Sequence, residues 1–438
     1  MKKLFKDKKV VVMGLGLLGG GVGVAKFFAK QGAKLLVTDL RTREELKPSL
    51  KKLKGLPIRF VLGKHRKEDF IKADLIIKNP AVSQNSLYLK IAKKHKIPIK
   101  TDIDIFFDLC PAPIIGITGT KGKSTTATLI YLFLKTKYPN TILAGNIGIS
   151  PLQVLEKINR NTKVVLELSS FELEDLKKSP AIAVITTLFP DHLNRYKSFN
   201  DYIEAKKPIF KYQKKNDILI LNADNPKTKE LSSSAKSKVY FFSDNSKAAA
   251  ALKVAKLLSV SDSQIKKVLS GFKGLANRQE FIAGKRGVKY FNDTTATTPQ
   301  SVILAIRDFK RKFPKSRLIL IAGGQDKELS YKELAREIKE RVDCLVLLLG
   351  SASDKIKKEL SSFSFVLAGS MEKAVKKAES LAQKGDIVLL SPGAASFTPL
   401  EVTKTKKKHK ALKPLTGFNL FKNEFDRGKQ FVQAVKKL

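Results

Sequence analysis

A glycine-rich loop near the middle of the chain has the residue types that bind a nucleotide phosphate. The sequence GITGTKGKSTT, residues 116–126, follows the apolar run PAPII, so a strand is predicted to lead into the loop and a helix to leave it. Glycines free backbone N–H groups to surround phosphate oxygens, Lys123 would neutralise their charge, and Ser124 or Thr125 could ligate Mg²⁺. The spacing is GxxGxxGKST rather than the strict GxxxxGK[ST], but Lys-Ser at a strand-to-helix junction still predicts an ATP site. The loop is expected to supply Gly119, Thr120, Lys121, Gly122, Lys123, Ser124 and Thr125.

Two later strands end in residues that suit metal or proton chemistry. The apolar run TKVVLELSSFELE delivers Glu167 near its end, and AIAVITTLFPDHLNRY ends with Asp191 and His192. Ligands of an open parallel sheet bind beyond the carboxyl ends of its strands, so these side chains are expected near the phosphate loop. Glu167 would have a role there on Mg²⁺, whereas an exposed surface glutamate is the alternative.

A second glycine loop lies near the N-terminus, where KVVVMGLGLLGG leads into a predicted helix and then into the strand KLLVTDL. Gly14, Gly16 and Gly19 have the GxGxxG spacing, which lets a backbone approach a pyrophosphate at a helix N-terminus. Asp39, at the end of the second strand, could accept a hydrogen bond from a ribose or a base. The alternative is that the glycines serve only close helix–strand packing.

The composition limits the classes of protein that fit. With 438 residues, of which 43% are hydrophobic, the chain can bury roughly two to four cores. Its 84 Lys and Arg against 40 Asp and Glu give a formal charge of +44, which raises nucleic-acid binding as an alternative. The lysines are spread along the whole chain, however, and no arginine-rich or aromatic-interleaved basic motif occurs, so solvated surface lysines are the preferred interpretation.

Cysteine content and hydropathy bear on the compartment. Cys110 and Cys344 are far apart in sequence and predict no disulfide framework, which fits a reducing cytoplasm. The basic N-terminus leads into a glycine-interrupted strand rather than a signal sequence, and no long apolar run predicts a membrane span.

The order of the motifs resembles the Mur ligase family of peptidoglycan synthesis, which are ATP-dependent amide-forming enzymes related to folylpolyglutamate synthase. TGTKGKST, AGNIG, ELSSFE, DHLNRY and YIEAKKPIF carry the resemblance, which spans essentially the whole chain. In this family the lysine matching Lys206 is carbamylated and, with the histidine matching His192, helps to hold a second Mg²⁺. The resemblance therefore implies the metal ligands Ser124, Glu167, His192 and carbamylated Lys206, and the catalytic residues Lys123, Glu167, His192 and Lys206.

The C-terminal part resembles that of the family member that adds D-glutamate. Arg278 matches an arginine that contacts ATP phosphate, and Asn292 and Asp293 match a nucleotide-side segment in which Thr295 stands where a lysine is common. The closing FKNEFDRGKQF is similar to that member's C-terminal signature, with Glu424 in place of an aromatic residue. Resemblance implies that the amino-acid substrate is held by Thr297, Lys327, Ser396 and Phe425.

The same resemblance assigns the first glycine loop to the UDP of the nucleotide substrate. The substrates would be UDP-N-acetylmuramoyl-L-alanine and D-glutamate, and no nicotinamide would be needed. Ala81 stands where the family commonly has glycine. The implied UDP-substrate residues are Gly14, Leu17, Leu18, Asp39, Arg41, Asn79 and Asn146.

These observations predict an α/β chain of three domains. Residues 1–101 would form a Rossmann-like UDP-substrate domain, residues 102–275 a central P-loop domain with a parallel sheet, and residues 276–438 a Rossmann-like amino-acid-binding domain. A cytoplasmic monomer without nucleic-acid or membrane partners is expected. The lysine-rich segment 398–416 is interpreted as a flexible surface insertion.

Other functions stay open at this point. Another Mur-type or folylpolyglutamate-type ligase is the nearest alternative. A basic nucleic-acid-dependent ATPase would explain the charge but would leave Glu167, His192 and Lys206 without roles. A nicotinamide-dependent dehydrogenase would explain only the Gly14 loop.

Overall fold

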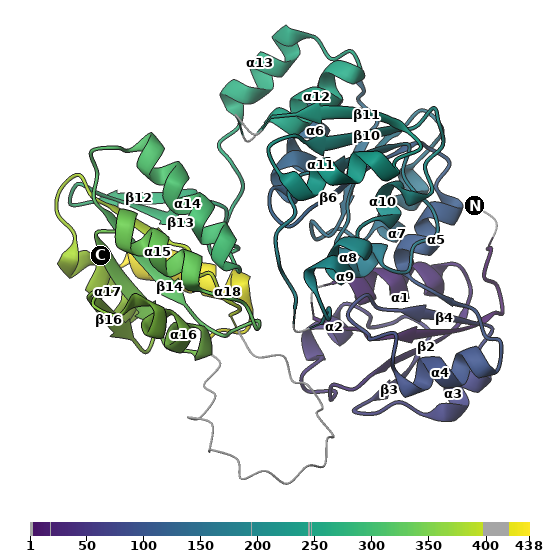
Figure 1. Ribbon diagram of the computed structural model, residues 1–438. Coiled ribbons are helices and arrows are strands. Elements are labelled where there is room, and N and C mark those ends of the chain that lie inside the picture. The colour runs from purple at the N-terminus through teal and green to yellow at the C-terminus, as the bar shows by residue number, and fades with distance from the viewer. Residues whose placement is uncertain (1–2, 18, 194, 244–245, 247, 397–419) are drawn as a thin grey trace. The chain divides into compact units, whose positions relative to one another are not determined.

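The chain forms three β-sheets, one in each successive part of its sequence, as the computed structural model shows (Figure 1). The structure describes residues 3–17, 19–193, 195–243, 246, 248–396 and 420–438. Predicted residue Leu18 and the lysine-rich segment 398–416 lie outside the described residues.

The first sheet is fully parallel, with the order β3-β2-β1-β4-β5. Its strands and the helices of this part are β1 (Lys9–Met13), α1 (Gly20–Lys30), β2 (Lys34–Asp39), α2 (Lys47–Lys51), β3 (Ile58–Leu62), α3 (Lys67–Ile71), β4 (Leu75–Lys78), α4 (Leu87–Lys94) and β5 (Ile99–Lys100). Strand, glycine loop, helix and strand follow one another as the sequence predicts, which confirms a Rossmann-like arrangement.

The second sheet is also parallel, with the order β11-β10-β9-β6-β8-β7. The connector that precedes it contains helix α5 (Asp102–Leu109), which begins at a capping box between Thr101 and Asp104. The strands are β6 (Ile114–Thr118), β7 (Thr141–Gly145), β8 (Lys163–Glu167), β9 (Ile182–Ile185), β10 (Ile218–Asn222) and β11 (Lys238–Phe242). The helices are α6 (Lys123–Lys137), α7 (Pro151–Val154), α8 (Ser170–Leu173), α9 (Phe199–Glu204), α10 (Pro208–Lys211), α11 (Pro226–Glu230), α12 (Ala249–Leu257) and α13 (Asp262–Gly271), with short 3₁₀ turns at Leu155–Lys157 and Leu231–Ser234.

The third sheet has the order β12-β13-β17-β14-β15-β16, and only the β12–β13 pair is antiparallel. Its strands are β12 (Glu280–Lys285), β13 (Val288–Asn292), β14 (Leu318–Gly323), β15 (Cys344–Leu348), β16 (Phe365–Ala368) and β17 (Ile387–Leu390). The helices are α14 (Pro299–Lys312), α15 (Lys332–Arg341), α16 (Ser351–Leu360), α17 (Met371–Leu381) and α18 (Glu424–Lys436).

Strand β14 shows why this sheet is covered on both faces. Leu318 and Leu320 belong to an apolar cluster with residues of α14, α15 and α16, whereas Ile319 and Ile321 belong to a second cluster with residues of α17 and α18. Successive side chains of a strand point to opposite faces, so an uninterrupted apolar run requires helices on both sides.

By contacts, the chain divides into two compact units. The first consists of residues 1–188 and 200–272 and contains the first two sheets, and the second consists of residues 189–199 and 273–438. The predicted domain boundaries at 101 and 275 stay predictions.

Candidate active site

The first glycine loop is held open by backbone conformations that favour glycine. Gly14 has φ +94°, and a Cβ built there would lie 2.9 Å from Cβ of Asn79. The Gly14 N–H donates to Thr38 O at 2.8 Å, and the Asn79 amide donates to Gly14 O at 3.2 Å. A side chain at Gly14 would therefore push β1 away from the segment after β4.

Asp39 fixes this loop rather than simply facing outward from it. Its Oδ2 accepts from the N–H groups of Leu15 at 2.8 Å and Gly16 at 3.0 Å, and its Oδ1 accepts from Arg41 N at 2.9 Å. The side chain is buried. Gly14, Asp39, Arg41 and Asn79 are thus brought together at the carboxyl edge of the first sheet.

Two large apolar side chains flank this edge and are unusually open. Leu17 is 48% exposed and Leu40 is 53% exposed. Leu40 was not predicted from the sequence, although its position directly after Asp39 was the available signal. Both expose apolar surface, Leu17 within the glycine loop and Leu40 directly after Asp39.

The phosphate loop joins β6 to α6 in the first unit, and it is fastened to the end of β9. Thr120 N donates to Thr187 O at 2.6 Å, and Thr186 Oγ1 donates to Lys121 O at 2.6 Å. Gly122 is the left-handed N-cap of α6, with φ +91°. The loop is therefore preorganised by neighbouring strands of the same sheet.

Lys123 lies folded over this loop. Its Nζ donates to Gly119 O at 2.9 Å and to Thr120 O at 3.0 Å. Ser124, the next residue, is buried in the first turn of α6. A phosphate bound here would meet both the ammonium and the N-terminus of a long helix.

Glu167 ends β8 next to the loop, because Glu167 pairs in register with Ile117 of β6. It is 1% exposed. Its Oε1 accepts from the Asn146 amide at 3.3 Å, which joins a predicted metal ligand to a predicted UDP-substrate residue. Its Oε2 is buried and has no hydrogen-bond partner within the described part of the chain.

Lys206 is 2% exposed and reaches the same strand ends. Its Nζ donates to Thr118 Oγ1 at 3.3 Å and to Gly119 O at 3.2 Å, and lies 4.7 Å from the centre of the Tyr202 ring. The structure therefore brings Lys123, Ser124, Glu167 and Lys206 to one edge of the second sheet.

These residues fit a hard cation. A buried carboxylate oxygen without a partner costs free energy that a bound cation would offset, and Mg²⁺ prefers such oxygen ligands. Among the described residues, no three His, Cys, Asp or Glu side chains cluster at metal-binding spacing. The predicted ligand set differs from such a cluster because it includes a hydroxyl and a modified lysine. Glu167 and Lys206 belong to the first unit and His192 to the second.

The predicted nucleotide-side residues of the second unit meet around a tight turn. Arg278 lies between Asn277 and Gln279, which both have positive φ. The Asn292 amide donates to Asn277 Oδ1 at 2.9 Å, and Asp293 Oδ1 accepts from Gln279 N at 3.2 Å.

Thr295 secures the same turn, since its Oγ1 donates to Asn277 O at 3.0 Å. At the position where a lysine is common, this chain therefore places a short hydroxyl side chain that holds the backbone beside Arg278.

The predicted amino-acid residues lie on loops that hydrogen-bond to one another. Lys327 Nζ donates to Thr297 Oγ1 at 3.1 Å. Gln325 and Ala395 exchange two backbone hydrogen bonds of 2.9 Å, which sets the loop of Lys327 beside that of Ser396. Phe425, on α18, is 51% exposed.

Arg427 is a residue whose importance the sequence analysis missed. Its side chain is fully buried, and it donates to Thr294 Oγ1 at 3.0 Å, Thr294 O at 2.8 Å and Ala394 O at 3.1 Å. Burial lowers its pKa to about 9, although the nearby Glu424 charge acts in the opposite direction. Arg427 therefore ties α18 to both the nucleotide-side and the amino-acid-side loops. The C-terminal signature FKNEFDRGKQF contains Arg427, but its partner Thr294 lies more than a hundred residues earlier in the chain.

Comparisons with known proteins agree with this arrangement. Three family models match in succession: the Mur ligase MurD-like N-terminal domain over residues 8–101, the Mur ligase middle domain over 117–278, and the Mur ligase glutamate ligase domain over 277–393.

Full-length relatives and a solved structure extend the match. The chain is 40% identical to a UDP-N-acetylmuramoylalanine--D-glutamate ligase of Roseiflexus sp., over 98% of each chain. It is 37% identical to the enzyme of that name from Borreliella burgdorferi, over 99% of this chain and 98% of the relative. The fold resembles MurF ligase from Thermotoga maritima in complex with ADP, with TM-score 0.56 and 18% identity over 90% of this chain and 93% of that one. Because identity of this level extends over nearly the whole chain, the protein belongs to the Mur ligase family and is a MurD-like member of it.

Proposed function

We propose that this chain is an ATP-dependent ligase that adds D-glutamate to UDP-N-acetylmuramoyl-L-alanine during peptidoglycan precursor synthesis. The observation that carries the proposal is the meeting of Lys123, Glu167 and Lys206 at one sheet edge, in a chain whose full-length relatives bear that ligase name. The residues of the first sheet edge would hold the UDP portion, with Leu17 and Leu40 against the base.

Joining a carboxylate to an amine requires a better leaving group than oxide. The γ-phosphoryl group of ATP would pass to the L-alanyl carboxylate, giving an acyl phosphate and ADP. Lys123 would leave the carbonyl oxygens of its own loop and bind the phosphate, and Arg278 would neutralise charge from the second unit. The amine of D-glutamate would then attack the acyl carbon, and inorganic phosphate would leave.

Two Mg²⁺ ions are proposed, held by Ser124, Glu167, His192 and carbamylated Lys206, and when bound they would reduce the repulsion between two anionic reactants. The carbamate would supply a negative charge where an ammonium would repel a cation.

The experiment is phosphate release from Mg-ATP with UDP-N-acetylmuramoyl-L-alanine and D-glutamate, with each substrate omitted in turn. We expect release only when all three are present, together with one equivalent of the amide product. Equal release with another amino acid in place of D-glutamate would favour a ligase of different acceptor specificity. ATP hydrolysis that required DNA instead would contradict the proposal.

The assignment of the UDP substrate to the first glycine loop, and not to the phosphate loop, has its own test. Asp39→Ala should raise the KM for the UDP substrate far more than the KM for ATP, because Asp39 accepts hydrogen bonds from the first glycine loop and from Arg41 N, at the edge of the first sheet. Equal changes in both KM values would contradict this assignment.

A further inference from the structure

Lys327, which the resemblance assigns to the amino-acid substrate, forms a nearly buried ion pair with Asp191, a residue to which that assignment gives no role. Its Nζ lies 3.2 Å from Asp191 Oδ1 and 3.1 Å from Thr297 Oγ1. The side chains of Lys327 and Asp191 are only 14% and 10% exposed. All three residues belong to the second unit.

Asp191 is held in place by the loop Phe189–Phe199. Its Oδ1 also accepts from His192 N at 2.8 Å, and its Oδ2 lies 3.6 Å from His192 Nε2. The ammonium of Lys327, 3.2 Å from Oδ1, favours the ionised carboxylate of Asp191.

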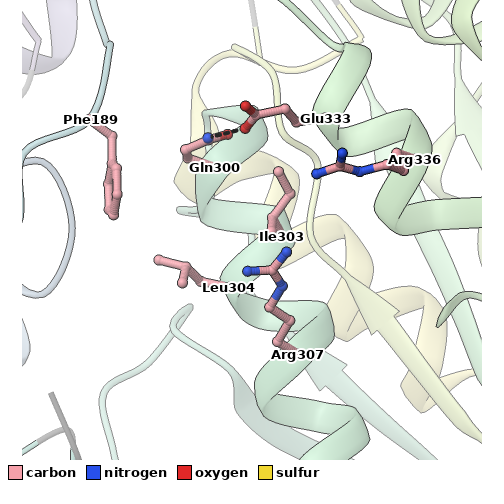
Figure 2. Close-up of a pocket in the computed structure, with 7 residues that line it drawn as sticks. All are labelled: Phe189, Gln300, Ile303, Leu304, Arg307, Glu333 and Arg336. Carbon is pink, nitrogen blue, oxygen red and sulfur yellow. Dashed lines mark hydrogen bonds between the residues drawn. The ribbon is translucent and has the colours of Figure 1, made fainter. Parts of the chain in front are cut away.

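Apolar contacts hold the Phe189–Phe199 loop against other elements of the second unit. Leu193 packs against the apolar cluster of α14 to α16. Figure 2 shows Phe189 opposite Ile303 and Leu304 of α14, around a pocket of about 120 Å³. The carboxylate of Asp191 is thus presented to Lys327 by an anchored backbone.

We propose that the Asp191–Lys327 pair is the receptor for the α-amino-acid zwitterion of the acceptor. The α-carboxylate of the acceptor replaces Asp191 on Lys327, beside Thr297, and its α-ammonium pairs with the carboxylate of Asp191. This proposal rests on the proposed function and adds Asp191 to the residues that bind the acceptor.

Charge balance favours this exchange. A ligand with only carboxylates would take Lys327 but would leave Asp191 ionised, poorly solvated and beside a second anion, which is costly. A zwitterion separates the pair and satisfies both of its members. The pair therefore selects an acceptor that carries an amine next to a carboxylate, and it holds that amine before it loses its proton to become the nucleophile.

The test compares D-glutamate with glutarate, which has the same two carboxylates but no amine. In Asp191→Asn we expect the KM for D-glutamate to rise by about 10- to 100-fold, as for the loss of a charge-assisted hydrogen bond. The inhibition constant of glutarate, measured in competition with D-glutamate, should stay the same or decrease, because no carboxylate competes with it for Lys327. Asp191→Ser, which also lacks the charge, provides the same comparison if the asparagine variant does not fold.

Two controls complete the design. Lys327→Met should weaken D-glutamate and glutarate alike, since both use that ammonium. Asp354→Asn removes an exposed carboxylate of α16 that pairs with Lys357 at 2.7 Å, and it should change neither constant.

The outcomes are separable. If parent enzyme shows no D-glutamate-dependent phosphate release, the proposed function fails. If the parent is active but the charge-removing variants weaken D-glutamate and glutarate equally, Asp191 merely supports Lys327 or His192, and the zwitterion proposal is overturned while the ligase assignment stands.

Discussion

At the scale of single residues, burial determines what Lys206 can do. A lysine that is 2% exposed, with its Nζ against a hydroxyl, a carbonyl and an aromatic face, is not a solvated surface residue. In a chain with 84 basic side chains, this location separates one lysine from the many that only contribute surface charge.

Lys206→Ala should lose most activity and one of the two proposed metal ions, because the carbamate ligand is gone. Titration of Mn²⁺ in place of Mg²⁺, followed by electron paramagnetic resonance, would count the sites, and a short carboxylic acid is expected to restore part of the rate. Lys206→Arg should not be rescued, since guanidinium keeps a positive charge. Parent-like activity of Lys206→Arg would disprove the carbamate.

Glu172 is a second buried ionisable residue, and its effect is on stability. Its Oε2 accepts from Ser169 N at 2.7 Å and Ser169 Oγ at 2.6 Å in a capping box. Burial, and next the charge of Asp102, raise its pKa from 4.5 to about 8. The folded protein therefore keeps a proton that the unfolded chain releases, so this contribution is complete below pH 4.5 and is lost as the pH rises through about 8.

Glu172→Gln should mimic the protonated form while keeping the capping box. We expect the variant to match the parent in free energy of unfolding at about pH 4 and to exceed it by roughly 4 kcal/mol at about pH 9. Urea denaturation at both values would measure the difference. An equal effect at both pH values would show that Glu172 is charged throughout.

At the scale of elements, helix α18 holds two loops of the second unit together through Arg427. One guanidinium donates to Thr294 and Ala394, so a C-terminal helix fixes loops that precede and follow most of the third sheet. A buried charged group of this kind has no replacement among neutral side chains that could reach both carbonyls.

Arg427→Met should therefore raise the KM values for ATP and D-glutamate together and lower the free energy of unfolding by about 3 kcal/mol, because two carbonyls lose their donors. Arg311→Met, on the exposed face of α14, is the matched control and should change neither. A variant with unchanged KM values would show that the loops are held by other contacts.

Element contacts also explain what sequence alone can and cannot predict. The two glycine loops were predictable because their spacing is local and each lies between an apolar strand and a helix. Glu167 was predictable as a strand end. The contacts of Arg427 with Thr294 and of Lys327 with Asp191 join residues that are 133 and 136 positions apart, and no local pattern encodes such a pairing.

Asp39 is a second residue whose partners could not be predicted from the sequence. Its position at a strand end predicts a ligand contact, which stays a prediction; the contacts with three backbone N–H groups of the loop region could not be predicted from that position. Which partner a carboxylate finds depends on how two separate loops meet in space.

At the scale of the whole molecule, the formal charge of +44 is the dominant property. Lysines occur along the whole sequence and give a general attraction to polyanions. Within the part of the chain that the structure describes, no helix is long and apolar enough to span a membrane.

Duplex DNA should bind weakly, lose affinity steeply with added salt, and leave ATP hydrolysis unchanged. Heparin is the control polyanion and should compete with DNA at similar charge concentration. Fluorescence anisotropy at several salt concentrations, with parallel phosphate-release assays, would test both statements, and DNA-stimulated hydrolysis would revive a nucleic-acid function.

The Phe189–Phe199 loop belongs to the second unit, although residues 200–272 separate it in sequence from the rest of that unit. The second unit is assembled from two separate stretches of sequence, so a recombinant fragment of residues 273–438 would lack one part of the unit. It would expose the apolar surface that Leu193 covers and would leave Lys327 without Asp191. A synthetic peptide with the sequence of the loop should bind such a fragment in trans, in the manner of a split protein, and the fragment's tendency to aggregate should fall as the peptide is added.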